Sequence, residues 1–200
     1  MKDERLVTPF DQDRIANCSY ELSMGPQALL TGEDQIRRDL ANDEQLRIPS
    51  GHFAQLMTEE KVRIPPDALG LISMKSQVKR LGLVNVSGFH VDPGFHGRLR
   101  FSVYNAGPSS VYISRGTPTF LIWFTALDTP TDDLYEGHGG RPAFTDQDTM
   151  EMQGDVFTPQ VLADRMATIE RKIGWRIQLG SYLAGTIVGA IITLLFQALT

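Results

Sequence analysis

Residues 74–105 read MKSQVKRLGLVNVSGFHVDPGFHGRLRFSVYN. A polar, basic segment opens this stretch, and an apolar run, a turn and an alternating run come after it. Asp92-Pro93-Gly94 predicts the turn, because Pro presets φ and Gly accepts a positive φ. Residues 98–104 alternate between polar and apolar side chains, which is typical of a strand with one buried face. We also expect a short helix over residues 76–80.

The rest of the region 46–127 has the same strand character. Short β-branched and aromatic runs are interrupted by Pro and Gly, as at Ile64-Pro65-Pro66 and Ala106-Gly107-Pro108. Many short strands with frequent turns predict an all-β barrel or jelly roll. A further short helix is expected over residues 35–41.

The order of these features resembles the dCTP deaminase and trimeric dUTPase superfamily. In that family a Lys/Arg-Ser-Ser-x-x-Arg-Leu-Gly-Leu stretch precedes a hairpin, an Asp-Pro-Gly-aromatic-x-Gly turn and a strand that ends in Asn. Four further segments are similar to the family's other strands, and these are residues 15–25, 48–51, 58–65 and 115–124. The resemblance covers roughly residues 1–150. It implies a mainly β, dUTPase-like distorted jelly-roll barrel over residues 1–127, and a homotrimer with its sites between subunits.

The resemblance also implies a nucleotide site. Lys75, Ser76 and Arg80 match the family's phosphate-binding motif, except that Gln77 replaces its second Ser. The hairpin with Gly88 and Asp92 would line the base and sugar of a pyrimidine nucleotide. Two plainer interpretations stay open: the basic segment is a solvated turn, and Asp92 is only the first residue of a β-turn.

The chemistry that the resemblance implies is incomplete. The family's deaminases carry a catalytic Glu ten residues after the Asp of Asp-Pro-Gly, and here that position is Ser102. A hydroxyl has no useful basicity, so deamination is not expected. The dUTPase reaction would use Asp92 to position water, Mg²⁺ on the phosphates and a Gly-rich C-terminal arm, with Glu21 standing in for an acid of the opening strand. Residues 138–142 match that arm poorly.

Residues 128–157 are polar and contain Gly and Pro, and they form either an arm or a linker. The deaminases carry a lid over the nucleotide in this region. Only Tyr135 and the glycines match such a lid, so both interpretations stay open.

Residues 158–176 predict an amphipathic stalk helix that begins at Thr158-Pro159. Its apolar stripe consists of Leu162, Met166, Ile169 and Ile173. Residues 177–200 then form an uncharged, apolar run, and about 20 such residues span a bilayer. We expect a single transmembrane helix here, with a buried core helix as the alternative. Basic residues precede the run, which predicts an inner (cytoplasmic) membrane location with the N-terminal domain in the cytoplasm.

Composition and residue spacing restrict the partners, disulfides and metal sites that the chain can have. A net charge of −5 gives no basic surface for nucleic acid, which is therefore not an expected partner. The single cysteine, Cys18, cannot form an internal disulfide, and we expect it to be a small buried residue. The four histidines show no metal-ligand spacing, so no protein-held metal is expected, and Mg²⁺ would accompany a triphosphate.

Together these features predict a membrane-anchored, pyrimidine-nucleotide-binding sensor, scaffold or defence-type effector. The alternative is an active dUTPase-type pyrophosphatase or dCTP deaminase tethered to the membrane.

Overall fold

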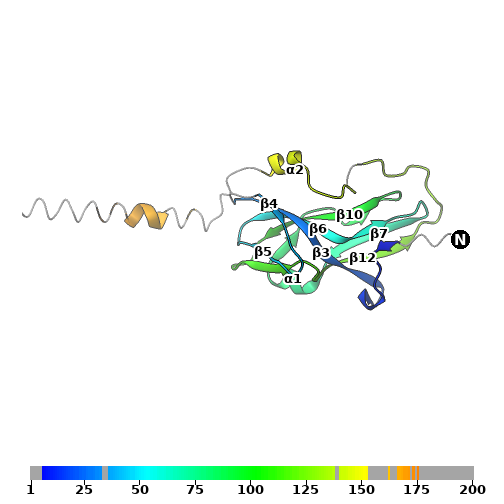
Figure 1. Cartoon of the computed structure of the whole chain (residues 1–200), viewed down its shortest axis with the longest axis horizontal. Coiled ribbons are helices and arrows are strands. Elements are labelled where there is room, and N and C mark those ends of the chain that lie inside the picture. Colours follow the sequence, from blue (N-terminus) through cyan, green and yellow to red (C-terminus); the bar gives the residue numbers. More distant parts are fainter. Residues whose placement is uncertain are drawn as a thin grey trace, which may run out of the picture. The chain divides into compact units, whose positions relative to one another are not determined.

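The computed structural model of the chain describes residues 6–32, 36–137 and 140–152, together with residues 162, 166–171, 173 and 175. The chain forms two compact units, residues 1–156 and residues 157–200, and each is described by itself. The described strands all belong to the first unit (Figure 1).

One curled antiparallel sheet dominates the first unit. Its described strands follow the order β8 (Leu83–Asn85), β10 (His96–Asn105), β6 (Phe53–Arg63), β3 (Ser19–Leu30), β12 (Pro118–Ala126), β7 (Ala68–Met74) and β9 (His90–Val91). Three short strands lie outside this order: β1 (Val7–Thr8) pairs with β6, whereas β2 (Ile15–Ala16) and β4 (Arg37–Asp39) pair with β3. A separate pair consists of β5 (Gln45–Ile48) and β11 (Val111–Ser114).

The two ends of this sheet are joined by the segment predicted as a hairpin, whose strands pair with β10 and β7 rather than with each other. Strands β8 and β9 are at opposite ends of the strand order, yet only residues 86–89 separate them in sequence. The N–H of Val86 donates to the carbonyl of Ser102 on β10 at 2.8 Å. The N–H of Ile72 on β7 donates to the carbonyl of Phe89 at 2.7 Å. The hairpin therefore bonds to both ends of the sheet and closes it into a barrel.

The core fills the inside of this barrel. Along β10, Leu99, Phe101 and Val103 are buried while the intervening residues are not, which is the expected period of two. The ring of Phe101 stacks on Phe120 of β12 with centroids 4.1 Å apart. The predicted mainly β fold is confirmed, and its main sheet is curled around this core.

A second, smaller apolar cluster covers the outer face of β3 and β6. Leu29 and Met57 pack there against Phe144 and Met152, which flank the helix α2 (Asp146–Glu151). Thr145 caps α2: its hydroxyl accepts from the N–H of Asp148, and the Asp148 carboxylate accepts from the N–H of Thr145. This ordered helix lies inside the segment predicted as a polar arm or linker.

The local predictions have mixed outcomes. The helix α1 spans Ser76–Arg80, as expected, and the turn at Asp92 is present with Gly94 at φ +87°. The helix expected over 35–41 is wrong where the chain is described there, because residues 37–39 form β4 and pair with β3. Pairing with a neighbouring strand overrides the local preference.

The prediction that Cys18 is buried is also wrong. Cys18 is exposed, because the expected opening strand breaks into β2 and β3. Asn17 and Cys18 form the turn between these strands, and Asn17 adopts φ 56°. The left-handed region suits Asn, whose short side chain tolerates it. Before this hairpin, residues Gln12–Arg14 form a 3-10 turn, η1.

In the second unit, residues 162, 166–171, 173 and 175 are helical. Their apolar stripe is exposed in this single chain: Leu162 50%, Met166 62%, Ile169 55% and Ile173 51%. Among the described residues, no helix has both the length and the apolar character needed to cross a bilayer. The predicted transmembrane segment, residues 177–200, lies outside the described residues.

Candidate functional site

A pocket of about 210 Å³ opens where the two ends of the sheet meet, and we call it the seam pocket. Its walls are formed by Ile72 of β7, the hairpin before β9, Leu99 and Arg100 of β10, Phe95 and Tyr135. The ladder between β8 and β10 ends at Val86, and the hairpin then crosses to β7. The pocket is the gap that this crossing leaves beside the edge of β10.

The hairpin supplies the pocket's polar rim. The Asn85 side chain accepts hydrogen bonds from the N–H of Ser87 at 3.2 Å and from its hydroxyl at 2.5 Å, so Ser87 is fixed. His90 Nε2 lies 3.4 Å from Asp92 Oδ1. A Cβ at Gly88 would meet no heavy atom within 4 Å, so open space borders the rim at this residue.

The backbone of Asp92 has a structural role, and its side chain is exposed. Its backbone carbonyl accepts from the N–H of Phe95 at 3.2 Å, which closes the predicted β-turn. Its side chain is exposed and lines the seam pocket. The turn role is therefore present in the structure, and the carboxylate is available to a ligand.

The basic segment around α1 forms a separate feature. Lys75 Nζ pairs with Glu21 Oε1 of β3, while Ser76 and Arg80 are exposed. Lys79 adds a cation that the sequence motif did not single out, and its Nζ donates to the hydroxyl of Ser73 at 2.7 Å. Within one chain, the described lining of the seam pocket does not include Lys75, Ser76 or Arg80. The structure thus brings Gly88 and Asp92 together and leaves the predicted phosphate-binding residues outside that group.

Ser102 is half-buried on β10, and its carbonyl accepts from Val86. It stands where the resemblance places the deaminase Glu. The described lining of the seam pocket contains one carboxylate, that of Asp92.

Arg100, two residues earlier on β10, is a site residue that sequence reasoning missed. Its guanidinium donates to Asp148 Oδ1 at 3.1 Å and to the carbonyl of Ala143 at 3.0 Å, and it lies 4.7 Å from the Phe144 ring centroid. Burial raises the pKa of the Asp148 carboxyl, but hydrogen bonds from Thr145 and the charge of Arg100 outweigh burial and lower that pKa overall. The pair is therefore ionised at neutral pH.

Tyr135 is the part of the predicted arm that reaches the pocket. Its N–H donates to the carbonyl of Pro93 at 2.8 Å, and its ring lies 5.5 Å from that of Phe95. The arm therefore contributes a wall to the seam pocket.

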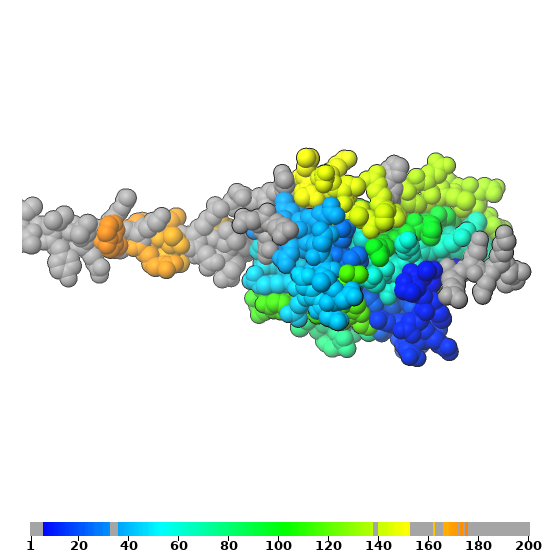
Figure 2. Space-filling view, viewed as in Figure 1, coloured from blue at the N-terminus to red at the C-terminus, as the bar shows by residue number. Residues whose placement is uncertain are grey.

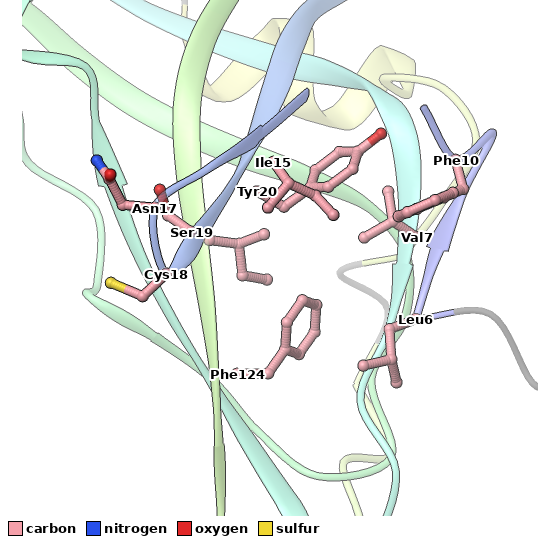
Figure 3. A pocket seen from close by; sticks show the side chains of 10 residues that line it. Leu6, Val7, Phe10, Ile15, Asn17, Cys18, Ser19, Tyr20 and Phe124 are labelled. Atoms are coloured by element: carbon pink, nitrogen blue, oxygen red, sulfur yellow. The ribbon is translucent and has the colours of Figure 1, made fainter. Parts of the chain in front are cut away.

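A second, larger hollow lies at the N-terminal side of the barrel (Figure 3). It has a volume of about 740 Å³, and the side chains of Leu6, Phe10, Ile15, Tyr20 and Phe124 surround it. None of the residues predicted to bind a nucleotide is among its described lining. We therefore place the candidate site at the seam pocket.

The chain is thus a mainly β protein, built on a curled antiparallel sheet with a pocket where the two ends of the sheet meet. A family model described as dCTP deaminase-like matches residues 1–127, and the chain belongs to this family.

Individual relatives agree with this assignment. The chain is 28% identical over 138 residues to a dCTP deaminase of Thermococcus kodakarensis, which covers 69% of this chain and 86% of the relative. It is 29% identical over 145 residues to a dUMP-forming dCTP deaminase of Aquifex aeolicus, covering 68% and 81%. Among solved structures, a 2'-deoxycytidine 5'-triphosphate deaminase from Agrobacterium tumefaciens superposes with a TM-score of 0.51 at 16% identity. That match covers 60% of this chain and 43% of the other, and it supports the fold alone.

Proposed function

We propose that the chain binds a pyrimidine deoxynucleotide at the seam pocket and serves as a membrane-anchored sensor, scaffold or defence-type effector, without deaminase chemistry. One observation carries the chemical part of this proposal. Ser102 occupies the position of the deaminase base, and the only carboxylate in the described pocket lining, Asp92, lies beside His90.

The size of the pocket decides which part of a nucleotide it holds. Ligand pockets typically measure about 300–1,000 Å³, and the seam pocket of about 210 Å³ is smaller. It suits a pyrimidine base and part of its sugar, with apolar walls from Ile72, Phe95 and Leu99. The phosphates would then project outside the pocket and need cations elsewhere.

Those cations are present on α1. Lys75, Lys79 and Arg80 lie close together in sequence, and Ser76 adds a hydroxyl. Because these residues do not line the pocket of their own chain, we propose that a second subunit supplies them in a homotrimer. The family resemblance supports this arrangement, since it implies sites between subunits.

Any Mg²⁺ would be held mainly by the triphosphate. Among the described residues, no group of three or more His, Cys, Asp and Glu side chains could hold a metal ion. Asp92 carries the one carboxylate in the described pocket lining, and we assign no step to a metal.

The binding proposal is tested on the full-length protein in mild detergent. Unfolding is followed by heating with dCTP, dUTP, dTTP and, as a purine control, dATP. A pyrimidine ligand at 100 times its Kd adds about 2.7 kcal/mol to the free energy of unfolding. No shift with any pyrimidine nucleotide, measured up to millimolar concentration, overturns the proposal.

The alternative is a working dCTP deaminase or dUTPase-type pyrophosphatase, and the curated relatives, which are dCTP deaminases, favour the deaminase. Products distinguish the two: deamination of dCTP releases ammonia, and pyrophosphatase action on dUTP yields dUMP and pyrophosphate. We expect neither from the wild-type chain. We also expect Ser102→Glu to remain inactive. The family's deaminases usually carry Thr-Ala-His-Arg-Ile-Asp in this hairpin, and Gly88, Phe89 and His90 depart from that pattern at three successive positions. Turnover of dCTP by the wild type would show that another residue supplies the base.

A further inference from the structure

Arg100 contributes to the seam pocket and also binds a segment outside it. It lines the seam pocket, and its guanidinium is held by Asp148 and by the carbonyl of Ala143. We call residues 140–152 the strap, because they lie along the outer face of β10, β6 and β3. Figure 2 shows the strap in yellow against the blue-to-green surface of these strands.

The strap contacts a part of β10 whose pairing with β6 is irregular. The pairing of β10 with β6 shifts register between Arg98 and Arg100, and the N–H of Leu99 donates to the hydroxyl of Thr58 at 3.0 Å. Regular ladder bonds therefore do not fix this pocket wall by themselves.

Strap contacts cover the same stretch of β10. The backbone of Gly140 packs so closely on Gly97 that a Cβ there would collide with the Gly140 carbonyl oxygen. Arg98 donates to the carbonyl of Pro142 at 3.4 Å, and Arg100 binds Ala143 and Asp148. The strap thus holds β10 at several successive residues next to the pocket.

The strap is itself anchored away from the pocket. Phe144 and Met152 are buried against Leu29 and Met57. The N–H of Phe144 donates to Gln27 Oε1 on β3 at 2.9 Å. Arg100 is therefore bound by a segment that also packs on the sheet through its own contacts.

We propose that Asp148 is a positioning residue for the seam pocket: through Arg100 it fixes the β10 wall, so that ligand binding and docking of the strap favour each other. The ligand part of this inference rests on the proposed function. The coupling is positive because a ligand that fits the ordered wall binds only when the strap holds it, and the linkage is reciprocal. An undocked strap lowers the population of the binding-competent wall and weakens apparent affinity by the same factor.

The variant Asp148→Asn tests the inference, and Asp146→Asn is its matched control. Both residues lie in the first turn of α2, and both changes remove one negative charge, but Asp148 binds Arg100 whereas Asp146 is exposed. Asp148 also accepts from the N–H of Thr145, and the side-chain oxygen of Asn can keep that capping bond. Full-length proteins in mild detergent are titrated with dCTP and dUTP by calorimetry. We expect about tenfold weaker binding for Asp148→Asn and wild-type binding for Asp146→Asn. Equal affinities for all three proteins overturn the inference.

Hydrogen exchange separates this inference from the proposed function. Without ligand, peptides covering residues 97–102 should exchange faster in Asp148→Asn than in Asp146→Asn. If no nucleotide binds the wild type, the proposed function fails, and this ligand-free comparison alone decides whether the strap fixes the wall. Should Asp148→Asn fold poorly, exchange in the wild type decides: nucleotide should slow exchange of residues 143–152, and unchanged exchange with bound nucleotide overturns the coupling.

Discussion

Lys75 Nζ lies 2.5 Å from Glu21 Oε1, and both side chains are about four-fifths buried, with 20% and 19% of their areas exposed. The cation that the sequence assigns to a phosphate group is thus already paired with a carboxylate of β3. A bound phosphate would have to share this cation with Glu21 or replace it.

The first prediction concerns this pair. Glu21→Gln should tighten nucleotide binding several-fold, because it removes a competing negative charge beside Lys75. Calorimetric titration at low and high salt measures the effect, which should shrink as salt screens the charges. Glu44→Gln, which removes a carboxylate that pairs with Arg38 on the loop before β5, is the control and should leave affinity unchanged. Weaker binding by Glu21→Gln would instead make Glu21 part of the ligand or metal site.

The second prediction concerns the exposed residues of α1. Arg80→Ala removes the charge-assisted hydrogen bond that we propose Arg80 donates to a phosphate, and such a bond contributes about 1.5–3 kcal/mol, so nucleotide affinity should fall at least tenfold. Ser76→Ala should weaken binding less, because a neutral donor contributes about 1 kcal/mol. Both variants should keep melting temperatures close to that of the wild type, since the side chains are exposed.

Lys61→Ala, which removes an exposed cation on β6, is the control for overall charge. If a nucleotide binds the wild type, Arg80→Ala and Ser76→Ala equally well, the phosphate site lies elsewhere. If both α1 variants fail to fold, the motif is structural.

Local chemistry made part of the fold predictable. Asp92-Pro93-Gly94 specifies its turn through Pro and Gly, and residues 98–104 specify a strand through their alternation. The prediction failed at residues 37–39 because Arg37, Arg38 and Asp39 are all charged and show no strand-like alternation, although they pair with β3.

The site was predictable only in its hairpin. The family motif led to Gly88 and Asp92, which line one pocket in the structure. Arg100 was missed because its partner Asp148 is 48 residues away and no pattern in the sequence joins them. Such long-range pairs arise from packing of the strap on the sheet, which no single-sequence periodicity encodes.

The third prediction concerns a buried carboxyl. Glu60 on β6 is 5% exposed, and its carboxylate accepts from the N–H of Ser23 at 2.8 Å and from the Ser23 hydroxyl at 2.9 Å. Burial raises the pKa of Glu60 more than the Ser23 hydrogen bonds and the charge of Arg14 lower it. The folded state therefore binds the proton more tightly than the unfolded state, whose carboxyl has the ordinary value of 4.5.

This raised pKa determines whether the free energy of unfolding rises or falls with pH. As pH rises from about 4.5 through the higher folded-state pKa, the contribution of Glu60 to the free energy of unfolding should fall. Urea unfolding of wild type and Glu60→Gln across pH 4 to about 8 measures it. The wild type should lose stability relative to Glu60→Gln over this window. A difference that stays constant with pH would contradict the raised pKa.

The fourth prediction concerns placement of the chain. Residues 177–200 form an uncharged apolar run behind the basic residues Arg171, Lys172 and Arg176, so the full-length protein should fractionate with membranes and need detergent for extraction. A chain truncated after Gly154 keeps the strap contacts of Phe144 and Met152 and should remain folded and soluble without detergent. Protease added to inverted vesicles should digest the N-terminal domain, and protease added to intact spheroplasts should not. Full-length protein that stays in the soluble fraction without detergent would rule out the anchor, and digestion in intact spheroplasts would reverse its orientation.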